Sequence, residues 1–139
     1  MASMFEMYSV LIFIALIGTA FSCSCMALGP IEDEFQKTHA VFIGRILHKT
    51  RPEPLKPVEY KMRVEEAFKG VSKGDMILVS AYEQSETCGL GIFNVGDRMQ
   101  VWLNENFSTD ACTQSTRIYT KDTSALRRLA DRHHQNFSS

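Results

Sequence analysis

Two cysteines separated by a single residue, Cys23 and Cys25, stand where an apolar leader ends and a polar sequence begins. If the chain is cleaved just before Cys23, a free α-amino group, a thiol and a second cysteine lie within three residues. Thiols form disulfides, and a neutral amine can bind a metal ion. This segment therefore either anchors disulfides only or also directs a chemical group at a partner.

The leader has the features of a secretory signal rather than of a membrane span. Residues 8–22 form a continuous apolar run, shorter than the roughly 20 residues that a spanning helix needs. The run ends with the small residues Ala20 and Ser22, at the two positions that signal peptidase inspects. The leader lacks Lys and Arg, which is unusual. We expect residues 1–22 to be a cleaved signal peptide, not an anchor, and residues 23–139 to form one secreted domain.

All four cysteines lie outside the leader, at Cys23, Cys25, Cys88 and Cys112. An even number in a secreted chain predicts two disulfides, with three possible connectivities. A bond between Cys23 and Cys25 would close a strained one-residue loop. The two other connectivities both tie the mature N-terminus to the later cysteines, and each bond would be worth about 4 kcal/mol in the chain-entropy model.

The charge balance of the chain disfavours two classes of partner. The formal net charge is −1, from 15 basic and 16 acidic residues. This balance does not favour nucleic acid or an anionic membrane as a partner. Sequons at Asn106 and Asn136 are possible N-glycosylation sites and agree with secretion.

The remaining pattern predicts the elements that must position the cysteines. We expect an extended arm at residues 26–30 and a short helix at residues 31–37. Four strands follow, at residues 40–49, 58–68, 75–82 and 98–103. A further short element begins at residues 111–113, and a terminal helix covers residues 122–134. Consecutive short strands with glycine turns favour a mainly β, OB-like barrel with a Greek-key order. Parallel βαβ architecture is disfavoured because no helices separate the strands.

Several motifs together resemble a known family. They are the Cys-x-Cys arm, Tyr60-Lys61-Met62-Arg63-Val64 running into Phe68-Lys69-Gly70, then Cys88-Gly89, Gly96-Asp97 and Cys112. This order is similar to the netrin-like module and, within it, to the inhibitory domain of the tissue inhibitors of metalloproteinases. The resemblance covers essentially the whole mature chain, and the N-terminal Cys-x-Cys is its most specific part.

The resemblance implies a fold and a disulfide pairing. The fold is a five-stranded OB-like barrel with short N- and C-terminal helices. The pairings are Cys23–Cys88 and Cys25–Cys112. The chain departs from the family in two ways. A usual third disulfide is missing, since Gln36 stands at about its first position and no cysteine follows Cys112. A second, cysteine-rich domain is also absent, so its functions are not carried over.

The resemblance also implies a function, namely inhibition of secreted or membrane-bound zinc metalloendopeptidases of the matrix metalloproteinase kind. The α-amine and carbonyl of Cys23 would bind the target's catalytic zinc, and Ser24 would point toward the specificity pocket. The remaining protease-contacting residues would be Cys25, Met26, Ala27, Thr87, Cys88, Gly89 and Leu90. The chain would have no catalytic residues, no cofactor or metal of its own, and would act as an extracellular monomer without nucleic acid or membrane.

Other interpretations remain open. Both cysteines of the arm can be plain anchors in a non-inhibitory netrin-like module, such as an extracellular-matrix adaptor. An enzyme is less favoured because no nucleophile, acid–base or metal set can be assembled. We expect His133 and His134 to complement a helix dipole and face solvent, residues 32–34 to be a solvated acidic turn, and Trp102 to be a packing residue.

Overall fold

The computed structural model describes residues 7–9, 11–12, 23–84, 87–116 and 123–138. The expected cleavage site after Ser22 lies outside these ranges, as does residue 122, where the terminal helix is expected to begin. No helix among the described residues is long and apolar enough to cross a membrane.

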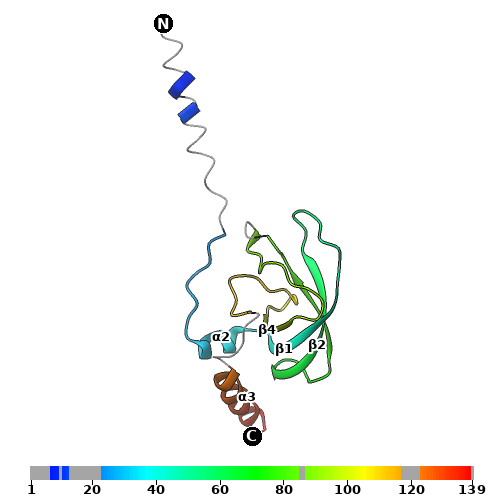
Figure 1. Cartoon of the computed structure of the whole chain (residues 1–139). Helices are drawn as coiled ribbons and strands as arrows, with labels where there is room; N and C mark the ends of the chain where they lie inside the picture. Colours follow the sequence, from blue (N-terminus) through cyan, green and yellow to red (C-terminus); the bar gives the residue numbers. More distant parts are fainter. Residues whose placement is uncertain (1–6, 10, 13–22, 85–86, 117–122, 139) are drawn as a thin grey trace.

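Four antiparallel strands form one sheet, in the order β3-β2-β1-β4, with a helix before and a helix after it (Figure 1). The elements are α2 (Ile31–Lys37), β1 (Ala40–Lys49), β2 (Val58–Lys69), β3 (Met76–Ala81), β4 (Arg98–Leu103) and α3 (Thr123–Phe137). The predicted arm, helices and first four strands are thus confirmed, with ends that move by up to three residues where they are described. β1 and β2, and likewise β2 and β3, follow each other in sequence and pair antiparallel, whereas β4 follows a longer connection and pairs with β1.

Irregular pairing gives the sheet its curvature. The register between β1 and β2 shifts at three places, one of them between Ile43 and Gly44. A Cβ at Gly44 would lie 2.8 Å from the ring of Phe42, so only glycine fits there without movement. Bulges of this kind bend a strand and increase its twist. Gly44 therefore marks a bend in β1.

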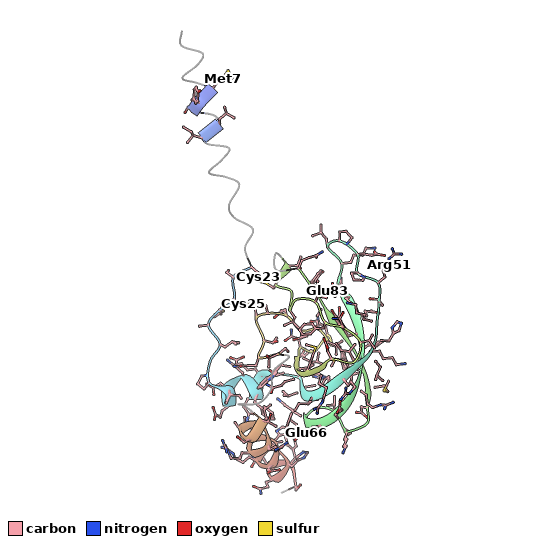
Figure 2. All side chains as sticks on the ribbon, viewed as in Figure 1. Met7, Cys23, Cys25, Arg51, Glu66 and Glu83 are labelled. Carbon is pink, nitrogen blue, oxygen red and sulfur yellow. A yellow bond between two sulfur atoms is a disulfide. The ribbon has the colours of Figure 1, made fainter. Side chains whose placement is uncertain are left out.

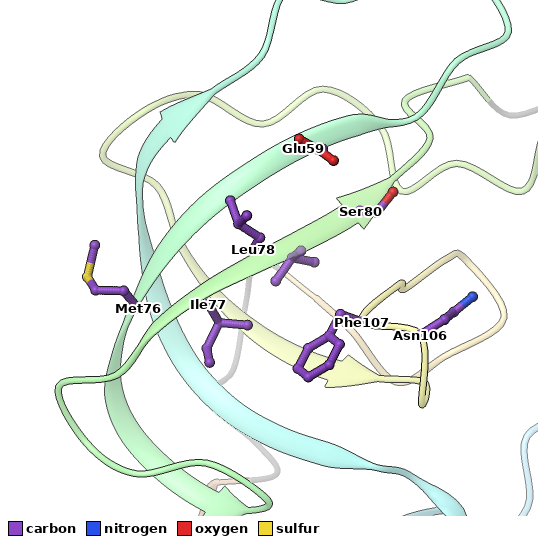
Figure 3. A pocket seen from close by; sticks show the side chains of 8 residues that line it. Glu59, Met76, Ile77, Leu78, Ser80, Asn106 and Phe107 are labelled. Atoms are coloured by element: carbon purple, nitrogen blue, oxygen red, sulfur yellow. The ribbon is translucent and has the colours of Figure 1, made fainter.

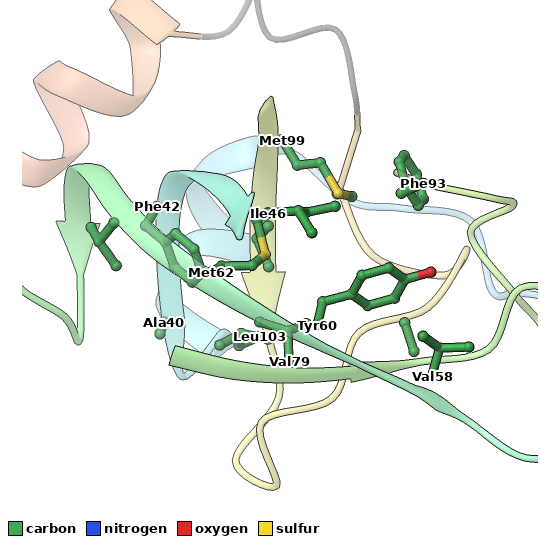
Figure 4. Packing of buried hydrophobic residues seen from close by; sticks show 13 residues of the cluster. Ala40, Phe42, Ile46, Val58, Tyr60, Met62, Val79, Phe93, Met99 and Leu103 are labelled. Atoms are coloured by element: carbon green, nitrogen blue, oxygen red, sulfur yellow. The ribbon is translucent and has the colours of Figure 1, made fainter. Parts of the chain in front are cut away.

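The two faces of the sheet bury two separate apolar clusters. On the inner face, alternate residues of β2, namely Tyr60, Met62 and Val64, pack with side chains from the three other strands (Figure 4). On the outer face, the ring of Trp102 packs edge-on against the ring of Phe35 in α2, with 6.2 Å between the ring centroids. Buried apolar residues of α3 belong to the same cluster. This period-two alternation is what a sheet covered on both faces requires. Trp102 is therefore a packing residue, as expected.

The five-stranded closed barrel is not confirmed. The described residues form an open sheet of four strands, and the chain extends it only through isolated bridges, Ser80–Ser108 and Gln100–Thr116. The further short element predicted to begin at residues 111–113 starts with a turn, and beyond this turn Thr116 forms the bridge to Gln100. Asp110 accounts for this, since its carbonyl and carboxylate accept hydrogen bonds from the next residues and hold the chain in a turn.

Candidate functional site

Two disulfides fix the arm formed by residues 23–30 against the loops at one end of the sheet (Figure 2). Cys23 pairs with Cys88 and Cys25 pairs with Cys112, with Cα–Cα distances of 5.1 and 5.2 Å. Both pairings implied by the family resemblance are confirmed. The arm itself has no helix or strand.

The four sulfur atoms form one cluster, within 4.8 Å of one another. Among the described residues this is the one group of cysteine, histidine or acidic side chains close enough to share a metal ion. Each sulfur is already bonded to another sulfur, so none is a thiolate, the form that binds zinc. In this state the chemistry left to the arm lies in its backbone and in its non-cysteine side chains.

The Cys88 loop is closed by its own backbone. The carbonyl of Gln84 accepts hydrogen bonds from the backbone N–H groups of Thr87 and Gly89, at 3.2 and 2.8 Å. The Thr87 hydroxyl donates to the same carbonyl at 2.9 Å. Leu90 then donates its N–H to the carbonyl of Tyr82 at 2.9 Å. These bonds fold the loop back onto the end of β3.

Close backbone approach explains the residue that follows the cysteine. A Cβ on Gly89 would lie 2.4 Å from the Gln84 carbonyl oxygen and 2.6 Å from that of Tyr82. Such contacts with backbone atoms cannot be relieved by turning a side chain. Cys88 itself has a φ of 57°, which costs a non-glycine residue about 1–2 kcal/mol. The disulfide and the hydrogen bonds together hold it there.

A half-buried polar cluster anchors the start of this loop. One carboxylate oxygen of Glu83 accepts a hydrogen bond from the Tyr60 hydroxyl at 2.9 Å and lies 3.0 Å from the Lys49 ammonium. The same ammonium donates to the carbonyl of Phe93 at 2.9 Å. Sequence reasoning missed this cluster because its members come from separate strands and loops, and no spacing along the chain relates them.

The surroundings of Tyr60 favour its neutral form. Burial, together with the hydrogen bond to Glu83 and the charge of that carboxylate, raises the pKa of Tyr60 well above its ordinary value. The phenol therefore remains a hydrogen-bond donor throughout the physiological range. The start of the Cys88 loop is held by one charged pair and one neutral donor.

The two disulfide-bonded loops are also joined directly. Ala111 donates its N–H to the carbonyl of Cys88 at 2.8 Å. Cys112 in turn donates its N–H to the carboxylate of Asp110 at 2.9 Å. The two loops and the arm therefore make one cross-linked unit, which we call the cysteine ridge (residues 23–28, 87–90 and 110–112).

The ridge presents the residues predicted to contact a protease. Ser24, Cys25 and Ala27 are exposed, and the side chain of Met26 is 92% exposed. At its far end the arm is tied to α2, where Gly29 donates its N–H to the Glu34 carboxylate at 3.3 Å.

The other side of the ridge is less accessible. Thr87, Cys88, Gly89 and Leu90 are each half-buried, and Leu90 packs partly against the inner core. The two disulfides thus place the start of the arm beside the Cys88 loop, in which Leu90 divides its surface between the core and the exterior.

Two lesser expectations need correction. His133 does not simply face solvent, since it is half-buried between the rings of Phe35 and Phe137, with centroids 6.1 and 4.8 Å away. His134 is exposed, as expected. In the acidic turn, Glu34 is only half-exposed because it holds the end of the arm.

Comparison with known proteins assigns no family. No family model matches the chain, and no curated protein matches it significantly.

Proposed function

We propose that this chain is a secreted inhibitor of zinc metalloendopeptidases that ligates the target's catalytic zinc through its mature N-terminus at Cys23. The observation that carries the proposal is the cysteine ridge, in which two disulfides hold an exposed arm beside the Cys88 loop. The OB-like barrel and passage through the secretory pathway belong to the same proposal.

The chemistry requires cleavage before Cys23. A free α-amine has a pKa of about 7.7–8.0, so the neutral form is a minority at physiological pH, and zinc binding shifts the equilibrium toward it. The amine nitrogen and the carbonyl oxygen of the same residue close a five-membered chelate ring. A catalytic zinc with three protein ligands keeps an open position for water. Occupying that position removes the nucleophile on which hydrolysis depends.

The disulfides supply rigidity rather than ligands. An arm fixed before binding loses little conformational freedom when it enters a cleft, which improves affinity. Ser24, Met26 and Ala27 would enter the cleft as a substrate strand does, while Thr87 and Leu90 flank it. The proposal gives the chain no catalytic residue and no cofactor, and the zinc belongs to the protease.

The decisive experiment adds one alanine before Cys23 in the mature protein. The nitrogen of Cys23 then becomes an amide, which does not ligate zinc as an amine does, so we expect inhibition of a zinc metalloprotease panel to be lost. The circular dichroism spectrum and the unfolding midpoint should stay unchanged. A matched control carries the same alanine at the C-terminus and should inhibit like the unmodified protein.

The same experiment separates the competing function. Undiminished inhibition by the extended protein would refute chelation. If N-terminal sequencing of the secreted protein shows a start at Cys23 but no protease of the panel is inhibited, the netrin-like matrix adaptor becomes the better interpretation.

A further inference from the structure

Strand β3 has one open edge. Among the described residues it pairs with β2 on one side and has a single bridge, at Ser80, on the other. There Ser80 donates its N–H to the carbonyl of Phe107 and accepts from the N–H of Thr109, both at 3.0 Å. In an antiparallel strand every second residue points its backbone to the same side. Met76 and Leu78 therefore direct their N–H and C=O groups to the open side.

An apolar groove runs along this edge. Its volume is about 530 Å³, and Met76, Leu78 and Phe107 line it while remaining 45%, 59% and 45% exposed. Figure 3 shows these side chains along β3 and the loop beside it. Exposed apolar patches next to an unpaired strand edge promote association, and proteins usually cover or charge them. A stable secreted chain therefore needs something to cover this groove.

The residue at the rim of the groove is Asn106, the first residue of a sequon. Its side-chain oxygen accepts hydrogen bonds from both the N–H and the hydroxyl of Ser108, the third residue of the sequon. This turn leaves the amide nitrogen as the free end of an exposed side chain (Figure 3). The groove and the acceptor nitrogen thus lie on the same short loop.

We propose that Asn106 carries an N-linked glycan whose first sugars cover this groove and screen the open edge of β3. A bond forms between the Asn106 amide nitrogen and the anomeric carbon of N-acetylglucosamine. The donor is a polyprenyl-pyrophosphate oligosaccharide, whose pyrophosphate leaves as the amide loses one proton. The proposal rests on the secretory route of the proposed function, because that donor exists only there.

A glycan fits this groove better than a second strand does. Pyranose rings have one face of C–H groups, which pack on aromatic and aliphatic side chains, and a rim of hydroxyls that stays in water. The attachment point is one residue from Phe107, so the sugar is held at the groove at a high effective concentration. A second copy of the chain would have to reach the same edge past the Asn106 loop.

The chain offers a matched control. Ser108→Ala and Ser138→Ala each remove one sequon, but Asn136 lies on α3 and does not line the groove. The full chain is expressed in secreting insect cells, and occupied sites are mapped by enzymatic deglycosylation in isotope-labelled water. We expect Asn106 to be modified. We expect Ser108→Ala alone to raise binding of an apolar fluorescent dye and to tighten self-association about tenfold.

Enzymatic removal of the glycan from the folded wild-type protein repeats the test without a folding step and should give the same rise. Unmodified Asn106 in secreted protein would overturn the proposal, as would equal self-association of the two variants. Protease inhibition, measured on the same samples, should not depend on the glycan. A chain retained in the cytosol would refute both the glycan and the secretory route, whereas loss of inhibition alone would refute only the inhibitor.

Discussion

The Cys88 loop and the Phe107 loop share an unusual backbone conformation but are held in it by different interactions. Each has a non-glycine residue in the left-handed region, with φ of 57° at Cys88 and 58° at Phe107. The first is held by a disulfide to the exposed arm as well as by backbone hydrogen bonds. The second is held by hydrogen bonds and by an edge contact of its ring with His39, without a disulfide, and its half-exposed ring lines a groove.

The difference concerns what each loop can present to a partner. A covalent cross-link fixes main-chain atoms in place and suits recognition of an extended strand or a metal ion. A loop held by hydrogen bonds can be covered by a flexible group without strain. Three sets of variants test the difference between the two loops, and their expected effects decrease from the disulfide to the exposed ring.

The largest effect should follow from removing the Cys23–Cys88 bond with the double change Cys23→Ser and Cys88→Ser. The bond closes a separation of 65 residues, so the free energy of unfolding should fall by about 4 kcal/mol. Inhibition should weaken but persist, because the backbone amine and carbonyl remain. Denaturant unfolding and inhibition assays measure the two effects separately. The parallel change of Cys25 and Cys112 to serine is the control, and a loss below about 1 kcal/mol in either variant would contradict the cross-link argument.

A smaller effect concerns the anchor of the Cys88 loop. Tyr60→Phe removes the hydrogen bond to Glu83 and should lower stability by about 1 kcal/mol at neutral pH. The raised pKa of Tyr60 favours the protonated phenol in the folded state. Its contribution is therefore complete below the ordinary value near 10 and declines above it, by up to about 1.4 kcal/mol per pH unit.

The measurement is a series of urea unfolding curves from pH 7 to pH 11 for both proteins, with the pH range chosen around the ordinary phenol pKa. The gap in stability between the wild type and Tyr60→Phe should narrow above pH 10. A constant gap across the whole range would show that the phenol does not titrate differently in the folded state.

The smallest effect is expected at Phe107. Phe107→Asn relieves the left-handed strain, worth about 1 kcal/mol, but loses a similar amount of apolar burial. Net stability should change by less than about 1 kcal/mol. The Asn106 sequon is preserved, but the change creates a second sequon over residues 107–109, so the comparison is made on protein produced without glycosylation. The control Phe107→Leu keeps the strain and loses ring contacts, so it should be less stable than Phe107→Asn in thermal unfolding. If Phe107→Leu were the more stable of the two, apolar burial at this position would outweigh the backbone strain.

The sequence was a good guide to local structure. Alternation at Val58, Tyr60, Met62 and Val64 identified β2, because a strand with one buried face must place apolar residues at every second position. It was a poor guide to closure of the sheet. Whether residues 104–113 complete a barrel depends on turns set by particular hydrogen bonds, and hydrophobic pattern carries no signal for them.

In the candidate site, too, some features could be predicted from the sequence and others could not. Spacing alone left two cysteine connectivities open, and the correct one followed only from the resemblance. The cluster of Lys49, Tyr60 and Glu83 had no sequence signal, since its residues meet only after β1 and β2 have paired. Gly89 offered a hint, because glycine beside a cysteine suggests close backbone approach.

Both disulfides join the same arm to the same pair of loops, while the two buried clusters of the sheet contain no cysteine. Chemical reduction would therefore detach the arm from both loops and, at about 4 kcal/mol for each bond, also lower the free energy of unfolding of the whole domain. Reoxidation would attach the arm again. Full inhibition would thus depend on an oxidising compartment, in which both disulfides form.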